Sequence, residues 1–309
     1  MPVVLTAAAV WLGGVARGQS DDQAFLDLRP HFVQGRVSTY RVWSLRQQTQ
    51  KVTANEHSQS FDTHLELEGE ITWTVRRVRS NGSATCVMTL LWMTSTSTGP
   101  DGATQHTDSR RSSGKPASLH KLLRAITGVP VTVDVGPDGS VLSATGIGAI
   151  GRKVPQGTTV PDALDFMESA SDLATISGAK AKSTLGDQWV VSYRWNHPLG
   201  KLRQTMRYNL QTVEDIAEIP VATVTGTARL KLDADPLPAP PGVGGRSQAR
   251  LIDGDVQTQV MFDLHRHEAI GRNTLEHRLV KIDLRWPKHT ITRTIDEHIH
   301  SQVIRIAER

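Results

Sequence analysis

Acidic side chains and a histidine alternate with mostly apolar residues along residues 61–75. The members of this stripe are Asp62, His64, Glu66, Glu68 and Glu70. On a β-strand this spacing puts the whole set on one face, at steps of about 6.6–7 Å, where neighbouring side chains could share an oxygen-seeking cation such as calcium. A solvated strand face shows the same alternation, so the stripe also fits an exposed surface without a ligand.

Imidazoles recur in two His-x-His pairs near the C-terminus. The pairs are His265 with His267 and His298 with His300. Each pair is expected on one side of a strand, and four imidazoles from neighbouring strands could bind zinc. His277 and His289 could add to such a patch. A strand expected over 274–286 would separate the pairs by about 9–10 Å, which favours surface histidines as the alternative.

The sequence carries no hydrolase signature, and its match to the dinucleotide-binding pattern lies in the wrong context. The chain has no Gly-x-Ser-x-Gly, no His-Glu-x-x-His and no Ser-x-x-Lys with its partners. Residues 146–151 match Gly-x-Gly-x-x-Gly, but 152–155 (RKVP) do not continue as a helix, so we interpret them as a loop. We therefore assign no catalytic and no cofactor-binding residue and expect no cofactor.

Composition and charge narrow the class of protein. The 309 residues are 38% hydrophobic, which is enough to bury a sizeable core. The 35 basic and 31 acidic residues are interleaved, and pairs such as Arg76 with Arg77 are too short to form a nucleic-acid module. The single cysteine, Cys86, excludes an internal disulfide, and its apolar surroundings predict a buried, inert thiol.

The N-terminus predicts export. Residues 3–15 (VVLTAAAVWLGGV) are apolar, too short to cross a bilayer core of about 30 Å, and typical of a signal peptide. Small residues before and at Gly18 predict cleavage there, so 1–18 is the expected signal peptide; a buried helix or strand is the alternative. No cysteine follows for lipid attachment. We expect an exported periplasmic or extracellular protein with no transmembrane segment, no lipid anchor and at most peripheral membrane contact.

Period-two alternation predicts strands through most of residues 19–309. They are expected over 61–75, 84–93, 129–135, 140–145, 187–195, 203–213, 217–232, 247–253, 255–265, 274–286 and 289–306. Turn residues separate several of them, at Asn81-Gly82, Asp101-Gly102, Pro137-Asp138-Gly139 and Asp253-Gly254.

Two segments have helical spacing instead. Residues 116–126 begin with proline and place four leucine and isoleucine side chains on one stripe, and 161–176 carry carboxylates in the first turns. Residues 233–246 are rich in proline and glycine and predict a long loop. The expected fold is mainly β: a single domain with one large antiparallel, curved meander sheet or half-barrel and two short amphipathic helices.

A family resemblance agrees with this fold class. Residues 28–35 (LRPHFVQG), with Tyr40 five positions on, resemble the opening of a family of exported bacterial proteins with no assigned function. Residues 185–189 (LGDQW) and the Gly-Pro-Asp-Gly turn within 131–141 are similar to its later landmarks. The resemblance implies a β-rich envelope protein, often lipid-anchored. A long-stranded sheet with helices on its concave face is also similar to the half-barrels of bacterial lipoprotein carriers.

These observations support three hypotheses for the function. The first is a non-enzymatic binding or envelope-associated protein that holds an apolar or amphipathic ligand. The second is a metal-dependent hydrolase built on the histidine pairs or the 62–70 stripe. The third is a structural module that docks an envelope partner through an exposed sheet edge.

Overall fold

The computed structural model describes residues 25–54, 57–111, 118–146, 174–197, 199–234, 246–285 and 290–308. Its strands are β1 (Val37–Ala54), β2 (His57–Val78), β3 (Ala84–Thr98), β4 (Thr104–Asp108), β5 (Pro130–Val135), β6 (Val141–Thr145), β7 (Gln188–His197), β8 (Gly200–Ile216), β9 (Ile219–Ala234), β10 (Arg246–Asp263), β11 (Glu268–Arg285) and β12 (Thr290–Glu308). Within these ranges there is one helix, α1 (Ser118–Ile126).

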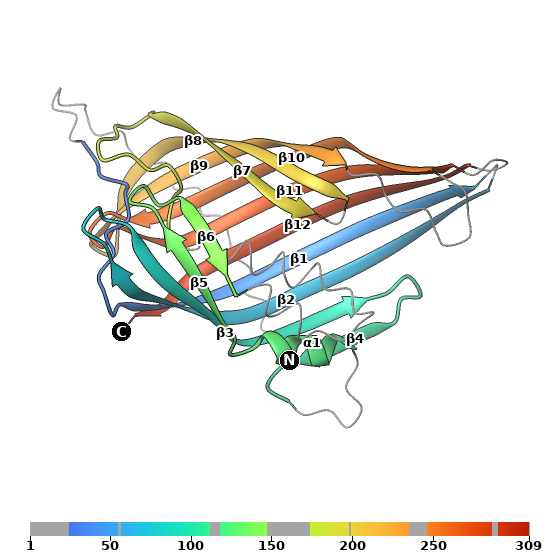
Figure 1. The fold of residues 1–309 in the computed structure, drawn as a ribbon, viewed down its shortest axis with the longest axis horizontal. Helices are drawn as coiled ribbons and strands as arrows, with labels where there is room; N and C mark the ends of the chain where they lie inside the picture. Colours follow the sequence, from blue (N-terminus) through green and yellow to red (C-terminus); the bar gives the residue numbers. More distant parts are fainter. Residues whose placement is uncertain are drawn as a thin grey trace.

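The described strands form one antiparallel sheet. Their order is β6-β5-β3-β2-β1-β12-β11-β10-β9-β8-β7, and β4 pairs with β3 outside this path. The chain starts at the centre, runs outward to β6, continues at the opposite edge with β7, and meanders back until β12 lies beside β1. Figure 1 shows this sheet curled, with β6 and β7 toward the viewer and the central strands behind. The expected curved antiparallel meander is confirmed.

One end of the curled sheet is covered by two irregular segments. The N-terminal segment (residues 25–36) bonds to the crossing segment (residues 174–187) through an isolated bridge between Leu26 and Ser183. The crossing segment in turn accepts a bond from Ala269 of β11 and donates one from Ala179 to Asp138 in the β5–β6 turn. It therefore ties together strands from both halves of the sheet.

Alternation along the strands assigns an inner and an outer face. The inner face carries the buried side chains: on β2, every second residue from Leu67 to Val75 is buried. One apolar cluster joins β1, β2, β3, β5 and α1, and a second joins β7 to β11 with Leu28 and Ile176. A third, smaller cluster is centred on Ala249, Val280 and Ile282 and is called here the distal cluster.

Helix α1 confirms one of the two expected helices. It buries Leu123 and Ile126 against the first cluster and ends before Gly128, whose φ is +75°. The second expected helix, 161–176, lies mostly outside the described residues. Its last three positions are described and are not helical, because Ala174 and Thr175 bond instead to the strand β11 and the β5–β6 turn. The expectation of a helix is wrong for these three positions.

The turn expected at Asp253-Gly254 is also wrong. Both residues lie inside β10, where the pairing with β11 shifts register between Leu251 and Asp253. A side chain at Gly254 would meet Cβ of Leu230 at 2.9 Å, so glycine is needed here for the close approach of β9 rather than for a turn. The strands expected over 247–253 and 255–265 are therefore one bulged strand. The turns at Asn81-Gly82, Asp101-Gly102 and Asp138-Gly139 are confirmed.

Strand β1 was not expected from the sequence. Its first half alternates, with Tyr40 and Val42 buried on the inner face. At the same face of its second half lie Arg46, Gln48 and Gln50, which break the apolar pattern that marks a half-buried strand. The short strand β4 was also missed.

Three further expectations concern the signal peptide, the proline- and glycine-rich loop and Cys86. The signal peptide (1–18) lies outside the described residues. Strand β9 ends at Ala234 and strand β10 begins at Arg246. The proline- and glycine-rich residues between these strands also lie outside the described residues. Cys86 is fully buried and free, as expected, and burial raises its pKa to about 12.

Candidate functional site

Charged and amide side chains form a belt across the inner face of β1, β11 and β12. Arg46 and Gln48 share the inner face of β1 with the buried Tyr40, because they follow it at even spacing. Glu297 of β12 and Arg278 of β11 face them from the neighbouring strands. This inner belt lies between the first apolar cluster and the distal cluster.

Within the inner belt, two guanidiniums face two carboxylates. Arg278 Nε donates to Glu276, and its Nη1 lies 3.5 Å from Oε2 of Glu297. Arg46 Nε lies 3.4 Å from the other oxygen of Glu297, and Gln48 Nε2 is 3.5 Å from that oxygen. Arg278 and Glu297 are about nine-tenths buried, so each needs its opposite charge nearby. This part of the belt is balanced in charge.

Arg293 of β12 is different, since it faces no carboxylate among the described residues. Its Nη2 donates to Oε1 of Gln50 at 2.8 Å, while its Nε is buried without a hydrogen-bond partner. Ile282 of β11 stands opposite it in register, and Ile295, on the same face of β12, packs on the distal cluster. The structure thus holds a half-buried cation beside apolar side chains, with one neutral partner.

Apolar side chains on the inner face near Arg293 remain half-buried. Phe61 of β2 and Ile291 and Ile295 of β12 belong to this group. They extend the apolar surface of the distal cluster toward β1 and β2. An aliphatic chain lying there would contact apolar atoms along its length and reach a guanidinium at one point.

A second set of buried charges lies near the covered end. The Tyr40 hydroxyl donates to Glu268, whose other oxygen accepts from Nη1 of Arg305 at 2.9 Å. Asp263 is fully buried and lies 3.4 Å from Nη2 of the same arginine. Burial, followed by the charge of Glu268, raises the pKa of Tyr40 well above its ordinary value, so the phenol stays a donor. This network is satisfied internally and joins β1, β12 and the β10–β11 turn.

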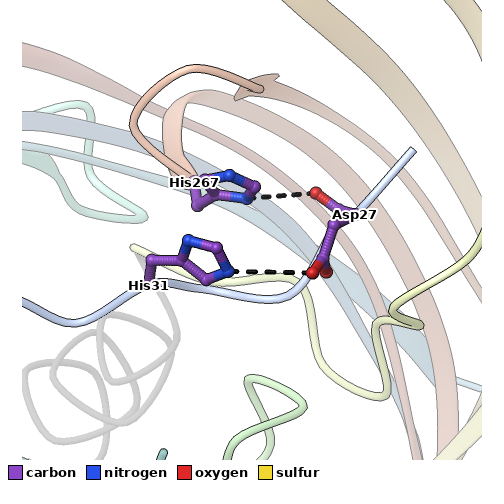
Figure 2. Close-up of side chains that lie close together, drawn as sticks. All are labelled: Asp27, His31 and His267. Carbon is purple, nitrogen blue, oxygen red and sulfur yellow. Dashed lines mark hydrogen bonds and ion pairs between the residues drawn. The ribbon is translucent and has the colours of Figure 1, made fainter. Parts of the chain in front are cut away.

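Two histidines meet at the covered end, where Figure 2 shows them beside Asp27. His267 Nδ1 lies 3.1 Å from the backbone oxygen of Asp27, and His31 Nε2 lies 3.7 Å from its carboxylate. Burial and the neighbouring His31 lower the pKa of His267. Burial opposes ionisation of Asp27, but its hydrogen bonds from Arg29 outweigh that effect and lower the pKa of the carboxyl.

These three residues could offer one ligand atom each to a metal ion. However, Arg29 already binds both oxygens of Asp27, at 3.0 and 2.7 Å, and neutralises it. The arrangement therefore fits a contact that fastens the N-terminal segment to the β10–β11 turn better than it fits a metal site.

The histidine pairs are only partly where the sequence placed them. His265 and His267 do not share one side of a strand: β10 ends at Asp263, and both lie in the following turn, with φ of +54° at His267. Asp263 Oδ1 accepts bonds from the backbone of His265 and of the next residue, which favours a turn here. The sequence-based expectation for this pair is wrong.

His298 and His300 do share the outer face of β12, with β11 between them and β10 as expected. His300 bonds to Asn273 at 2.7 Å, and burial lowers its pKa. His298 stacks on His277 of β11, with ring centroids 4.6 Å apart. The carboxylates of Asp296 and Asp255 lie 2.9 and 3.6 Å from the two ring nitrogens of His277. His289 lies outside the described residues.

The acidic stripe on β2 faces outward, as expected for a strand with a buried opposite face. Its carboxylates bond to side chains of β1: Glu70 accepts from Arg41, Glu66 from the indole of Trp43, and Asp62 from the hydroxyl of Thr49, at 2.7–2.8 Å. These bonds lie between strands, as on an ordinary polar sheet surface. His64 and Glu68 occupy the same outward face. Of the described residues, none in this stripe belongs to a group of three that could hold a metal ion.

The inner belt was missed by the sequence analysis. A signal was present in the run Ile291-Thr-Arg-Thr-Ile295, where an arginine occupies the middle of three alternate positions that are otherwise isoleucine. Its meaning depends on β12, which directs these positions inward.

Comparisons with known proteins leave the chain without an assigned family. No family model and no curated protein matches it. Among solved structures it is similar to OccK7 (OpdD) of Pseudomonas aeruginosa, at 9% identity over 88% of this chain and 99% of that chain, with a TM-score of 0.22. It is similar to OccAB4 of Acinetobacter baumannii at 6% identity over 87% and 98%, with a TM-score of 0.19. Likeness at these TM-scores carries no argument about fold or function.

The resemblance of residues 28–35 to an exported family is not tested by these comparisons and stays a prediction. In the part of the chain that the structure describes, no helix has the length and apolar character needed to cross a membrane.

Proposed function

We propose that the chain is an exported, envelope-associated binding protein without enzymatic activity, and that its inner face holds an amphipathic anion. The ligand class is an acyl chain with a carboxylate or phosphate head. One observation carries the proposal: Arg293 is a half-buried guanidinium beside apolar side chains, and among the described residues only Gln50 is its partner.

The head group follows from the chemistry of Arg293. A cation removed from water needs an opposite charge or several hydrogen bonds, and a buried donor without either is costly. A carboxylate or phosphate would supply both through a two-point contact with the guanidinium. In the inner belt, Arg46 and Arg278 are already matched by Glu297 and Glu276. Toward the covered end, Arg305 pairs with Asp263 and Glu268, and Arg272 donates to the backbone oxygen of Thr175. Arg293 is therefore the guanidinium of the belt that an anion would meet.

The tail follows from the side chains around it. Ile282, Ile295 and the half-buried Phe61 provide apolar surface on the same face. Each methylene that leaves water on such a surface contributes about 0.8 kcal/mol. A chain of ten or more carbons would therefore gain most of its binding energy from these contacts, while Arg293 would select the charged end.

Titration calorimetry with dodecanoate and with dodecanol tests this proposal. The two probes have the same tail, and only the first carries an anionic head. We expect dodecanoate to bind at least tenfold more tightly, and Arg293→Gln to reduce the difference to less than threefold. Lys281→Gln is the matched control, because it removes a cation from the outer face of the adjacent strand.

The variant should fold, since no carboxylate in the described part of the chain loses a partner when the charge of Arg293 is removed. Circular dichroism of both variants checks this point. Equal binding of the two probes to the unaltered chain, or an unchanged preference in Arg293→Gln, would overturn the proposed ligand class.

The exported location rests on residues 3–15 and requires its own test. Expression of the full chain in a bacterium, followed by fractionation and intact mass measurement, should give a periplasmic product that begins after Gly18. The same chain without residues 2–18 should stay in the cytoplasm. Full-length, uncleaved chain in the cytoplasm would refute the exported location and leave the ligand proposal untouched.

A further inference from the structure

The outer face carries a row of imidazoles and carboxylates across three neighbouring strands. Asp255 of β10 stands opposite His277 of β11, and His277 stands opposite His298 of β12. Asp296 precedes His298 by two positions and therefore points to the same side. Residues distant in sequence thus meet in one line perpendicular to the strands, on the opposite face from Arg293.

Two imidazole nitrogens in this row converge on the same oxygen. Oδ1 of Asp296 lies 2.9 Å from Nε2 of His277 and 3.4 Å from Nε2 of His298. The three potential ligand atoms lie within 4.8 Å of one another. A tetrahedral zinc ion with bonds of about 2.0–2.1 Å needs ligand atoms about 3.3 Å apart. The distance between His298 and Asp296 already fits this spacing, and the distance between His277 and Asp296 must open by a few tenths of an ångström. Asp296 is 46% exposed and can provide this movement by rotating its side chain.

Asp255 stands behind His277 rather than beside the other ligands. Its Oδ1 lies 3.6 Å from Nδ1 of His277, the nitrogen that faces away from Asp296. Without a metal ion, Nε2 forms a hydrogen bond with Asp296 at 2.9 Å. A cation bound to Nε2 would require the proton at Nδ1, where the carboxylate of Asp255 would face it. Histidines that bind metals commonly have such a partner.

The charge of the row favours a cation. Arg229 pairs with Asp253 at 2.9 Å, so these two cancel. Asp255 and Asp296 have only imidazoles as ion-pair partners among the described residues, which leaves two negative charges when both imidazoles are neutral. A divalent cation would balance them.

We propose that His277, His298 and Asp296 bind a divalent cation of the zinc class, with Asp255 positioning His277. Two imidazole nitrogens and one carboxylate suit zinc, nickel or copper(II), whereas calcium and magnesium prefer a shell made of oxygen atoms. Three protein ligands leave one position of a tetrahedral ion open to water or to a further ligand. The site belongs to the outer face and is independent of ligand binding on the inner face.

Zinc titration of the full chain after removal of metals with EDTA tests the site. We expect one zinc ion per chain by calorimetry and native mass spectrometry, and no binding of calcium. His277→Gln and His298→Gln should each weaken zinc binding by at least tenfold. Asp255→Asn should weaken it by about 10–100-fold, the range typical of a residue that orients a ligand.

Two further variants separate this row from other histidines. His64→Gln, on the outer face of β2, should bind zinc as the unaltered chain does. His267→Gln removes an imidazole of the cluster with Asp27 and should also leave binding unchanged. Cobalt(II) in place of zinc should give the visible absorption of a four-coordinate ion, which His298→Gln should abolish.

Failure of zinc to bind at one ion per chain would overturn the proposal. Full binding in both His277→Gln and His298→Gln would do so too, as would a loss confined to His267→Gln. Dodecanoate binding and circular dichroism of the same variants show whether a lost zinc ion reflects the site or the fold.

Discussion

The imidazole rings of His31 and His267 stack with their centroids 3.6 Å apart and their planes 24° from parallel. This contact joins the N-terminal segment to the turn between β10 and β11, where His31 also donates its backbone N–H to the carbonyl of His267. Two neutral imidazole rings can stack without electrostatic repulsion, whereas two protonated rings repel each other. The contact therefore predicts a pH dependence.

Acid should destabilise the protein through His267. Burial first, and then the charge of His31, lower its pKa, so the unfolded chain takes up the proton more readily than the folded one. The stabilising contribution is present above the ordinary histidine pKa and is lost as the pH falls below it. We expect the Tm to fall between about pH 7.5 and pH 5.5.

His267→Asn should make this fall smaller, since asparagine tolerates the φ of +54° but does not titrate. Differential scanning calorimetry across the pH range measures it. His265→Gln, an exposed position in the same turn, is the control. An identical pH dependence in His267→Asn and in the unaltered chain would contradict the assignment.

Loss of the Tyr40 hydroxyl should cost stability. In Tyr40→Phe the buried carboxylate of Glu268 keeps Arg305 but loses its phenolic donor. A buried acceptor that loses one partner costs about 1–3 kcal/mol, measurable as a decrease in the free energy of unfolding in urea. Combined with Glu268→Ala, the loss should be less than additive, because both changes remove the same bond. Full additivity would show that the two side chains do not interact.

An added methyl group at Gly226 should disturb the core of the second half. A Cβ there would meet Thr258 Cγ2 at 2.8 Å and Met206 Sδ at 2.9 Å. Gly226→Ala should therefore lower the free energy of unfolding by about 1–3 kcal/mol. Thr227→Ala, on the exposed outer face next to it, should change it by less than about 0.5 kcal/mol. Equal effects of the two changes would argue against the assigned inner face.

Cys86 should be unreactive in the native protein. Its thiol is fully buried and its pKa is raised to about 12 by burial, so almost none of it is thiolate at neutral pH. Ellman's reagent should label less than about a tenth of the chains in buffer and close to one thiol per chain in urea. Rapid labelling of folded protein would place Cys86 outside the core.

The sequence by itself determined the features that depend on near neighbours in the chain. Alternation along 61–75 identified β2 and both of its faces correctly. The Asn81-Gly82 turn and helix α1 were readable for the same reason: turn residues and a helical stripe act within a few positions. The burial of Cys86 also followed from its apolar neighbours.

The tertiary structure decided what depends on pairing between distant strands. β1 escaped detection because Arg46, Gln48 and Gln50 are polar on its inner face, and only the partner strands make that face an inner one. Local propensity cannot identify a strand whose alternation fails in this way.

The row on the outer face depends still more on distant pairing. His277 meets His298 and Asp255 only because β11 pairs with β12 and β10 in one register. A shift of either strand by one residue would turn one member to the other face and separate the ligands. The sequence thus singled out His277 and His298, while the register of the sheet decided that they meet Asp296 and Asp255, because register is fixed by contacts along the whole length of each strand.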